Sequence, residues 1–384
     1  MVTRDEVIWC YRLILGREPE SEEAIVHQQQ YEDLETLRAF FLQSSEYKEK
    51  ISIKPSIQQL ETVEFKTMPE VSNVVTQKTV PVNSIKEINQ SDREEKWIVI
   101  SNCQTVGIAN SLSLLCANVT VEPCDIWQLT KNREYWEAKL PEYDQLIILA
   151  DIRHINVIDL SPYQNITWFP SFLFRAFHPD LCYVTSPDGH IKTPMDEYNS
   201  CLAFAAYKSN LTIHQTKNLY NNEVYQAVGF YNFWQAEKEQ LFRRFDDFDL
   251  DIRSSFVQWA RQGSFMYSGN HPKVNAIYDI ATLIARKIRG KHFETTIRPH
   301  DNLAVGPIYP IYPEIAENLG LKDGSYLFKP ISAYKLFDLD EFLEGSFGAY
   351  EKYNADALMI HDQYVHPYEN AMKYIAERKY EQSI

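Results

Sequence analysis

The chain has 384 residues, of which 45% are hydrophobic and 13% aromatic. This length suits two domains, and this composition excludes an intrinsically disordered protein. The net charge of -15 argues against non-specific nucleic-acid binding, which needs a basic surface. It does not exclude an anionic ligand, because a local cluster of Arg, Lys and backbone amides can hold one in an acidic protein.

Signals for export, membrane insertion and metal binding are missing from the sequence. The first residues carry acidic side chains before apolar ones and no small-residue cleavage site, so we expect no signal peptide. The longest apolar runs, such as residues 146–150, are too short to span a bilayer. Six cysteines without a CxxC pair indicate reduced thiols, and no His/Cys cluster has zinc-like spacing. We therefore predict a cytoplasmic protein with no membrane span and no metal site.

Residues 1–50 predict a small helical module. Apolar residues recur at helical spacing until Gly-Arg-Glu-Pro at 16–19, and a second amphipathic segment follows. The pattern Tyr-x-x-x-Leu-Gly-Arg-x-Pro, followed by Phe-Leu-x-Ser-x-Glu-Tyr, resembles the helical modules of the DUF4214 type, which accompany bacterial surface-polysaccharide proteins. The resemblance implies docking to other polysaccharide-assembly enzymes. Residues 51–95 have three prolines, no glycine and a polar end, and so predict a flexible or surface-draped linker.

From residue 96 onward, strand and helix signals alternate. We expect strands near 97–101, 118–123, 145–150 and 166–170, with helices at 105–116 and 126–139. This alternation predicts an α/β fold over residues 96–384, with a parallel sheet flanked by helices.

Helical signals dominate the remainder of the chain. Residues 194–262 are mainly helical, with 224–245 the clearest segment, and residues 269–290 form a strong amphipathic helix. From about residue 291 we expect a helical C-terminal extension.

Asn102, Cys103 and Gln104 follow the first predicted strand directly. In parallel α/β sheets, ligands bind beyond the carboxyl ends of strands, where free N–H groups at helix N-termini attract anions. The helix dipole is expected to lower the pKa of Cys103, which suits a nucleophile or a ligand contact. The alternative is a small thiol that packs under the sheet.

Two further motifs carry histidines. Pro272 suits the first helical position, which places His271 at a helix start with Asn270 as a capping residue. Near the positive end of the helix the imidazole stays neutral and is able to accept a proton. The alternative is a cap without chemistry. Arg175 and His178 lie in a polar turn with Asp180, where the Arg175 guanidinium is suited to bind phosphate. The alternative is a surface turn shaped by proline and aspartate.

Taken together, Asn-Cys-Gln after the first strand, His-Pro-Asp in the middle and Asn-His-Pro before a late helix resemble the bacterial polysaccharide-biosynthesis family WcbI, from about residue 96 to about 290. The resemblance implies an SGNH-like, flavodoxin-like α/β fold, and an association with coenzyme A and acyl transfer to capsular polysaccharide. It also implies Cys103 as nucleophile and His271 as general base. Asn102, Gln104, Arg175, His178 and Asn270 become cofactor or pocket contacts.

The sequence departs from SGNH patterns at two positions. The usual Gly-Asp-Ser is Ser101-Asn102-Cys103, and the Asp that usually lies three residues before the histidine is Ser268. Asp180 replaces that carboxylate only if the fold brings it close to the imidazole.

The leading hypothesis is a CoA-dependent acyltransferase, with acetyl-CoA as expected donor and a sugar or polysaccharide precursor as acceptor. In it, backbone N–H groups at residues 103–105 stabilise the oxyanion. An SGNH-type glycan esterase or deacetylase, and a non-catalytic CoA- or nucleotide-binding scaffold, are the alternatives.

Overall fold

The computed structural model describes residues 2–14, 19–46, 94–155, 157–292, 295–331 and 335–381. The chain divides into two compact units, Met1–Glu87 and Ile88–Ile384. Residues 51–93 of the predicted linker lie outside the described residues, and its last residue, Glu95, already belongs to a strand. Within the described ranges, no helix combines the length and the apolar character needed to cross a membrane.

The first unit contains α1 (Arg4–Ile14), α2 (Glu22–Gln28) and α3 (Leu34–Gln43). Ser21 and Asp33 cap α2 and α3, because each side chain accepts a hydrogen bond from a backbone N–H in the first turn. The three helices share a small apolar core made of Val2, Val7, Cys10, Tyr11, Ile25, Leu37 and Phe41. The docking role of this module stays a prediction.

A four-stranded parallel sheet is the centre of the second unit. Its strands are β1 (Glu95–Ser101), β2 (Val119–Asp125), β3 (Gln145–Leu149) and β4 (Ile166–Phe169), in the order β2-β1-β3-β4. All four predicted strands are confirmed, and so is the α/β class. The order matches the start of the 2-1-3-4-5 order of flavodoxin-like sheets.

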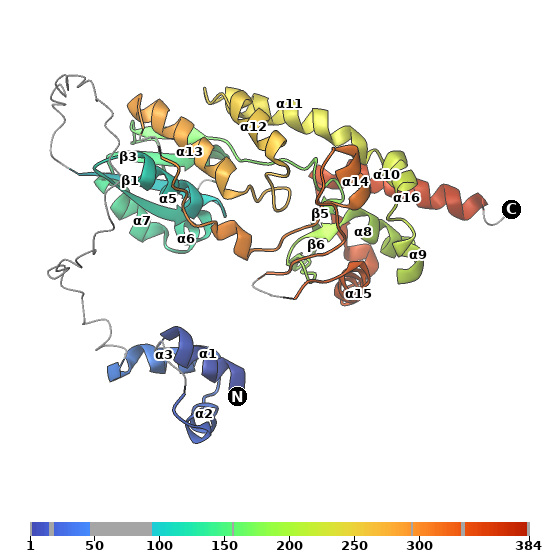
Figure 1. The fold of residues 1–384 in the computed structure, drawn as a ribbon, viewed down its shortest axis with the longest axis horizontal. Coiled ribbons are helices and arrows are strands. Elements are labelled where there is room, and N and C mark those ends of the chain that lie inside the picture. The colour runs from blue at the N-terminus through green and yellow to red at the C-terminus, as the bar shows by residue number, and fades with distance from the viewer. Residues whose placement is uncertain are drawn as a thin grey trace, which may run out of the picture. The chain divides into compact units, whose positions relative to one another are not determined.

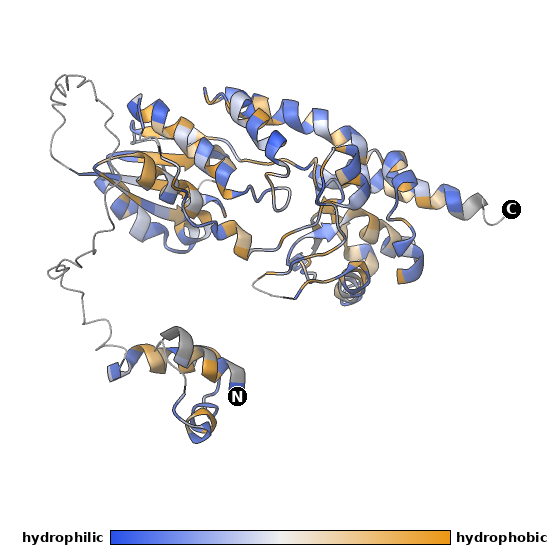
Figure 2. Ribbon diagram, in the orientation of Figure 1, coloured by the Kyte–Doolittle hydropathy of each residue, from blue (hydrophilic) through white to orange (hydrophobic). Residues whose placement is uncertain are grey.

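Helices cover both faces of this sheet, which is why β1 and β3 are continuous apolar runs. Residues 97–101 and 146–149 are buried, and Figure 2 shows the hydrophobic colour concentrated on these strands. On one face, α5 (Thr105–Leu115) packs against α13 (Val274–Arg289). The helices approach closely at Gly107, where an added Cβ would lie 3.1 Å from the Ile277 side chain.

The predicted helix at 126–139 is two helices, α6 (Ile126–Lys131) and α7 (Arg133–Lys139). Asn132 separates them, because its backbone at φ -121° and ψ 43° is not helical. The crossover from β2 to β3 passes over β1, which places these helices on the face opposite α5. In Figure 1, α7 and α13 lie on different sides of the strands.

The part of the chain that follows the sheet is mainly helical. They are α8 (Cys201–Lys208), α9 (Ile213–Lys217), α10 (Asn222–Val228), α11 (Phe233–Asp246) and α12 (Arg253–Gln262). The predicted helix at 224–245 is wrong in one respect: Gly229 adopts φ +84° and ends α10 in the left-handed conformation. A 3-10 turn, η3 (Phe230–Asn232), then leads into α11.

The C-terminal extension is helical but returns to the domain core. It contains α14 (Pro313–Asn318), α15 (Leu339–Tyr350) and α16 (Val365–Glu381). Tyr368 of α16 stacks on Phe204 of α8, with ring centroids 5.3 Å apart. Short strands that sequence patterns did not predict tie the layers together: β5 (Leu181–Cys182), β6 (Val184–Ser186), β7 (Gly189–His190), β8 (Asn199–Ser200) and β9 (Met359–Ile360).

Candidate functional site

A cavity of about 600 Å³ opens where β1 ends. Asn102 and Cys103, which directly follow this strand, line it. The chain leaves β1 to pair on one side with β2 and returns to pair on the other side with β3, and open α/β sheets bind ligands at such a switch point. The cavity therefore lies where this topology favours a ligand.

The other walls come from segments that are far apart in sequence. They are Trp127 of α6, Tyr183, residues 195–198, Asn270, His271, Asn302, Leu303, Gly306, Pro307 and Ile331. Cys103 and His271, the two residues predicted as catalytic, thus line the same cavity, together with Asn102 and Asn270.

Cys103 lies in a tight turn and is the one half-buried thiol, since the other five cysteines are buried. Its Sγ lies 3.8 Å from Asn102 Oδ1, which also accepts a hydrogen bond of 3.1 Å from the Gln104 N–H. Burial raises the pKa of the Cys103 thiol to about 12, although its backbone N–H opposes the rise. The expected lowering of this pKa is wrong, because desolvation of the thiolate outweighs the helix N-terminus.

The same turn limits the oxyanion site expected at residues 103–105. The Gln104 N–H already donates to Asn102 Oδ1, and the Thr105 N–H donates to the Asn102 carbonyl at 3.0 Å. Of the three N–H groups, only that of Cys103 has no acceptor on another described residue, and it lies beside the Cys103 sulfur.

His271 precedes α13 rather than opening it. The helix begins at Val274, because Lys273 is still extended, and the His271 carbonyl accepts a hydrogen bond of 2.7 Å from the Tyr267 N–H. The expected helix start at Pro272 is therefore wrong by two residues. Burial lowers the pKa of His271 to about 4, so the imidazole is neutral as expected, for a different physical reason.

Gln104 does not line the cavity. Its buried side-chain amide donates hydrogen bonds of 3.1 Å to the carbonyls of Phe172 and Asn270. The prediction of Gln104 as a cofactor contact is corrected: the residue braces the turn that carries Cys103 against the loop that carries His271.

Asn270 lies on the cavity wall inside a polar network. Its Oδ1 accepts hydrogen bonds from the Tyr198 hydroxyl at 2.6 Å and from the Ser268 hydroxyl at 3.1 Å, and its amide donates to the Tyr183 hydroxyl at 3.2 Å. The Tyr198 ring packs edge-on against His271, with centroids 5.8 Å apart. The network fixes Tyr198 beside the imidazole and links it through Asn270 to Tyr183.

A family model described as the polysaccharide biosynthesis enzyme WcbI matches residues 96–291, just over half of the chain. The chain belongs to the WcbI family. The match runs from β1 to the end of α13 and includes Cys103 and His271. These are polysaccharide biosynthesis enzymes.

A solved structure of WcbI, described as the native protein without a disulfide bond between CoA and a cysteine, is similar with a TM-score of 0.49 and 14% identity, over 76% of this chain and 98% of that chain. No curated protein matches the sequence.

Arg175 faces the interior of this WcbI-family domain and does not line the cavity. Its guanidinium pairs with the buried Glu237 carboxylate at 2.9 Å and donates to the Gln363 carbonyl at 2.9 Å. The predicted role of Arg175 as a phosphate contact stays a prediction, and its charge is already neutralised by a partner on α11.

His178 is a core residue, and its predicted role as a pocket contact is also corrected. Burial lowers its pKa to about 3, and its Nδ1 is sealed without a hydrogen-bond partner. Asp180 lies in the core as well, where it accepts hydrogen bonds from the Leu202 N–H at 2.9 Å and the Tyr312 hydroxyl at 2.6 Å. Asp180 thus binds the first turn of α8, whose N-cap is Ser200, and forms no hydrogen bond with His271.

No carboxylate in the described part of the chain forms a hydrogen bond with His271. Its Nδ1 is buried without a partner, next to Gly306, where an added Cβ would lie 3.5 Å away. The described residues therefore supply no third member of a triad, and packing against Tyr198 and Gly306 orients the imidazole instead. The described residues also contain no cluster of side chains able to hold a metal ion.

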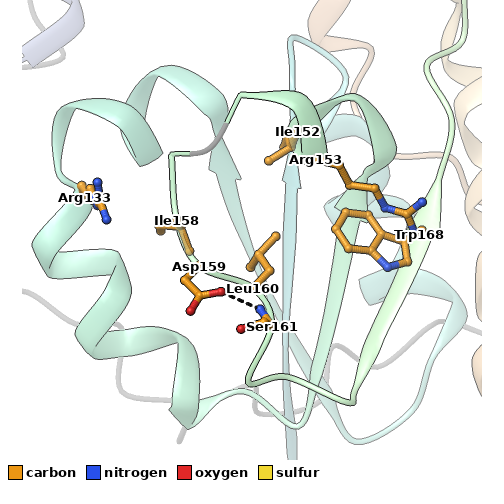
Figure 3. A pocket seen from close by; sticks show the side chains of 8 residues that line it. All are labelled: Arg133, Ile152, Arg153, Ile158, Asp159, Leu160, Ser161 and Trp168. Carbon is orange, nitrogen blue, oxygen red and sulfur yellow. Dashed lines mark hydrogen bonds between the residues drawn. The ribbon is translucent and has the colours of Figure 1, made fainter.

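A second cavity of about 480 Å³ lies beyond β3 (Figure 3). The Arg153 guanidinium covers the Trp168 ring at 3.9 Å, and Arg133 comes from α7. None of the residues predicted as catalytic or cofactor-binding lines this second cavity.

Sequence reasoning missed Trp127, Tyr183, Glu197 and Tyr198. Tyrosines and tryptophans usually indicate core packing, and Glu197 follows no motif. The available signal was position: Trp127 follows β2 at the same sheet edge at which Cys103 follows β1.

Proposed function

We propose that this WcbI-family protein transfers an acyl group, with acetyl expected, from CoA to a hydroxyl of a sugar or polysaccharide precursor. One observation carries the proposal: Cys103 and His271 line the same cavity at the ligand-binding edge of the sheet. The choice of CoA as donor follows from the family resemblance, and an SGNH-like relationship of the fold belongs to the same proposal.

The cavity fits the thioester end of CoA. Its volume of about 600 Å³ is typical of small-molecule sites, and it offers a thiol and a neutral imidazole. None of its described lining residues is Lys or Arg. The phosphates of CoA would therefore lie outside this wall, because phosphate binding in proteins relies on cationic side chains or free N–H groups.

His271 acts as the general base in this proposal. Its neutral imidazole takes the proton of the acceptor hydroxyl while the oxygen attacks the thioester carbonyl. The C–S bond breaks, and the proton passes from the imidazolium to the departing thiolate. The Cys103 N–H donates to the carbonyl oxygen as it becomes negative.

Cys103 contacts the thioester as a neutral thiol. A covalent route would need the thiolate, and with a thiol pKa of about 12 and an imidazole pKa of about 4 the proton stays on sulfur. These shifts favour direct transfer, without an acyl-cysteine intermediate.

The test uses the full chain with acetyl-CoA and a panel of sugar acceptors, and follows the acetylated product by mass spectrometry. His271→Ala is expected to abolish transfer, whereas His366→Ala, at an exposed histidine of α16, retains it. Incubation with acetyl-CoA alone is expected to leave the mass of the protein unchanged. Full activity of both Cys103→Ala and His271→Ala would overturn the proposal.

The other two hypotheses are outcomes of the same experiment. Hydrolysis of a simple acyl ester without CoA, together with no thermal stabilisation by CoA, would identify an esterase. CoA binding without turnover of any acceptor would identify a binding protein, and the absent carboxylate partner of His271 is the observation that favours it.

A further inference from the structure

The charge of the cavity wall indicates which ligands the cavity favours. Its described lining includes two carboxylates, Asp196 and Glu197, and no Lys or Arg. Asp196 is paired with Lys192 at 3.2 Å. The ammonium of Lys329 donates a hydrogen bond of 2.9 Å to the carbonyl of the lining residue Gly306. The net charge that the wall presents to a ligand is therefore negative.

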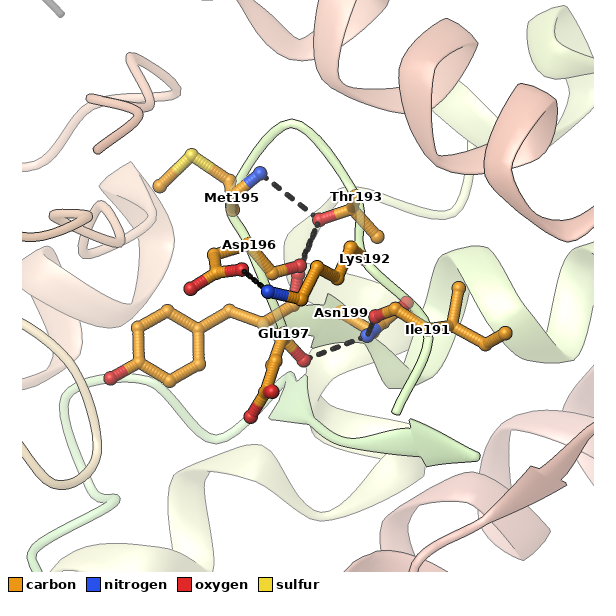
Figure 4. A network of polar contacts seen from close by, with 8 residues as sticks. Ile191, Lys192, Thr193, Met195, Asp196, Glu197 and Asn199 are labelled. Atoms are coloured by element: carbon orange, nitrogen blue, oxygen red, sulfur yellow. Dashed lines mark hydrogen bonds and ion pairs between the residues drawn. The ribbon is translucent and has the colours of Figure 1, made fainter. Parts of the chain in front are cut away.

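Glu197 is the carboxylate available to a ligand. Among the described residues, no hydrogen bond or ion pair is formed by its side chain, which is half-buried in the wall. Its backbone, in contrast, is held in place: the Asn199 amide donates to the Glu197 carbonyl at 2.9 Å and to the Ile191 carbonyl at 3.3 Å (Figure 4). A backbone that is fixed in advance reduces the conformational entropy that is lost when its side chain binds a ligand.

The loop before Glu197 is also rigid. The Thr193 hydroxyl accepts a hydrogen bond of 3.0 Å from the Met195 N–H and donates one of 2.7 Å to the Tyr198 carbonyl. Asp196 adopts φ +58°, a left-handed conformation that is uncommon outside glycine and that often marks functional sites. Residues 193–199 thus form a braced loop, of which residues 195–198 line the cavity.

Trp127 supplies an aromatic face at the same cavity. Its side chain is 64% exposed, although a tryptophan is among the costliest residues to leave in water. The amide of Asn302, which forms no side-chain hydrogen bond among the described residues, adds a donor and an acceptor. An exposed ring, a free amide and one free carboxylate suit a ligand with C–H faces and many hydroxyl groups.

We propose that this cavity contains the sugar-binding subsite and that it takes neutral or amino sugars and rejects acidic ones. Sugar hydroxyls donate to the Glu197 carboxylate, and the ring lies on Trp127. An amino group strengthens the contact with Glu197, whereas a uronate or phosphate is repelled by it in a partly desolvated site. The assignment of this sugar as acyl acceptor rests on the proposed function; the binding preference does not.

The test measures binding to the full chain without an acyl donor, by saturation-transfer NMR and calorimetry. The probes are methyl glucoside, methyl glucosaminide and methyl glucuronide. We expect the amino sugar to bind at least as tightly as the neutral one, and the glucuronide about tenfold more weakly or not at all. Glu197→Gln should remove the difference between the three, and Glu134→Gln, at an exposed site on α7, should leave it unchanged.

Substitution of Trp127 is the second part of the binding test. Trp127→Ala should weaken binding of all three probes about tenfold, and Trp127→Phe should keep most of the affinity. Binding in this order without acyl transfer would support the subsite and reject the acyltransferase. Equal binding of the glucuronide, insensitivity to both Glu197→Gln and Trp127→Ala, or no binding of any probe would overturn the subsite.

Discussion

The side-chain amide of Gln104 donates a hydrogen bond of 3.1 Å to the carbonyl of Asn270, so the neighbour of Cys103 is tied to the neighbour of His271. The same amide also donates to the Phe172 carbonyl. One buried side chain therefore sets the spacing between the two loops that carry the proposed chemistry.

Replacing this amide tests its role. Gln104→Met keeps the size of the side chain but leaves two carbonyls without a donor, so we expect a loss of about 1–3 kcal/mol in the free energy of unfolding. Urea denaturation measures this loss. Gln128→Met, at an exposed position of α6, is the matched control and should change stability by less than about 0.5 kcal/mol. Equal behaviour of the two variants would contradict the bracing role.

The reactivity of Cys103 follows from its raised pKa. Because thiolate is the reactive form and the thiol has a pKa of about 12, iodoacetamide should modify Cys103 slowly at pH 7.5, and the rate should still rise with pH above 9. Peptide mass spectrometry identifies the modified cysteine, with Cys103→Ser as the control. A rate that is already maximal near neutral pH would show an activated thiolate.

Stability should fall in acid because two histidines are buried in the neutral form. The pKa is about 3 for His178 and about 4 for His271, below the value of about 6.5 expected for an unfolded chain, so unfolding takes up protons between these limits. Stability is therefore complete above pH 6.5 and is lost as the pH falls toward 4.

Between pH 7 and pH 5 we expect a loss of about 2 kcal/mol per buried histidine. Urea denaturation at the two pH values measures it. His178→Gln should be less stable at pH 7 but should lose less stability on acidification. An unchanged pH dependence in this variant would refute the assignment to His178.

Arg175 and Glu237 give a prediction about folding rather than ligand binding. Glu237→Gln leaves the Arg175 charge poorly solvated, and we expect a loss of about 3–5 kcal/mol in stability. The affinity for CoA, measured by calorimetry below the unfolding temperature, should be unchanged. Arg253→Ala, which removes an exposed ion pair with Asp246, should have little effect on either property. A gain of CoA affinity in Glu237→Gln, from the released guanidinium, would restore the phosphate-binding role of Arg175.

Sequence patterns predicted the sheet well because its signals are local. A strand that is covered on both faces is a continuous apolar run, and β1 and β3 show this pattern. Breaks within helical segments were missed, since Gly229 and Asn132 end helices through backbone conformations that hydrophobic periodicity does not report. The short strands were missed because two-residue pairings depend on tertiary contacts.

The candidate site was predictable only in part. Cys103 follows a strand, and that position indicates the ligand-binding edge. In sequence, Arg175 and His178 resemble the other candidate ligand contacts. Their surroundings, however, are set by Glu237 and Tyr309, which lie far along the chain. Burial likewise reversed the expected pKa shift of Cys103, because a short sequence window does not report how much protein covers a thiol.

The residues that line the cavity are spread along the chain from residue 102 to residue 331, so the cavity forms late during synthesis of the protein. A nascent chain that has completed β4 already contains the whole parallel sheet, yet it lacks Glu197, His271 and Ile331. Ligand recognition therefore arises only after most of the polypeptide has left the ribosome. C-terminally truncated products would keep Cys103 without the groups that surround it.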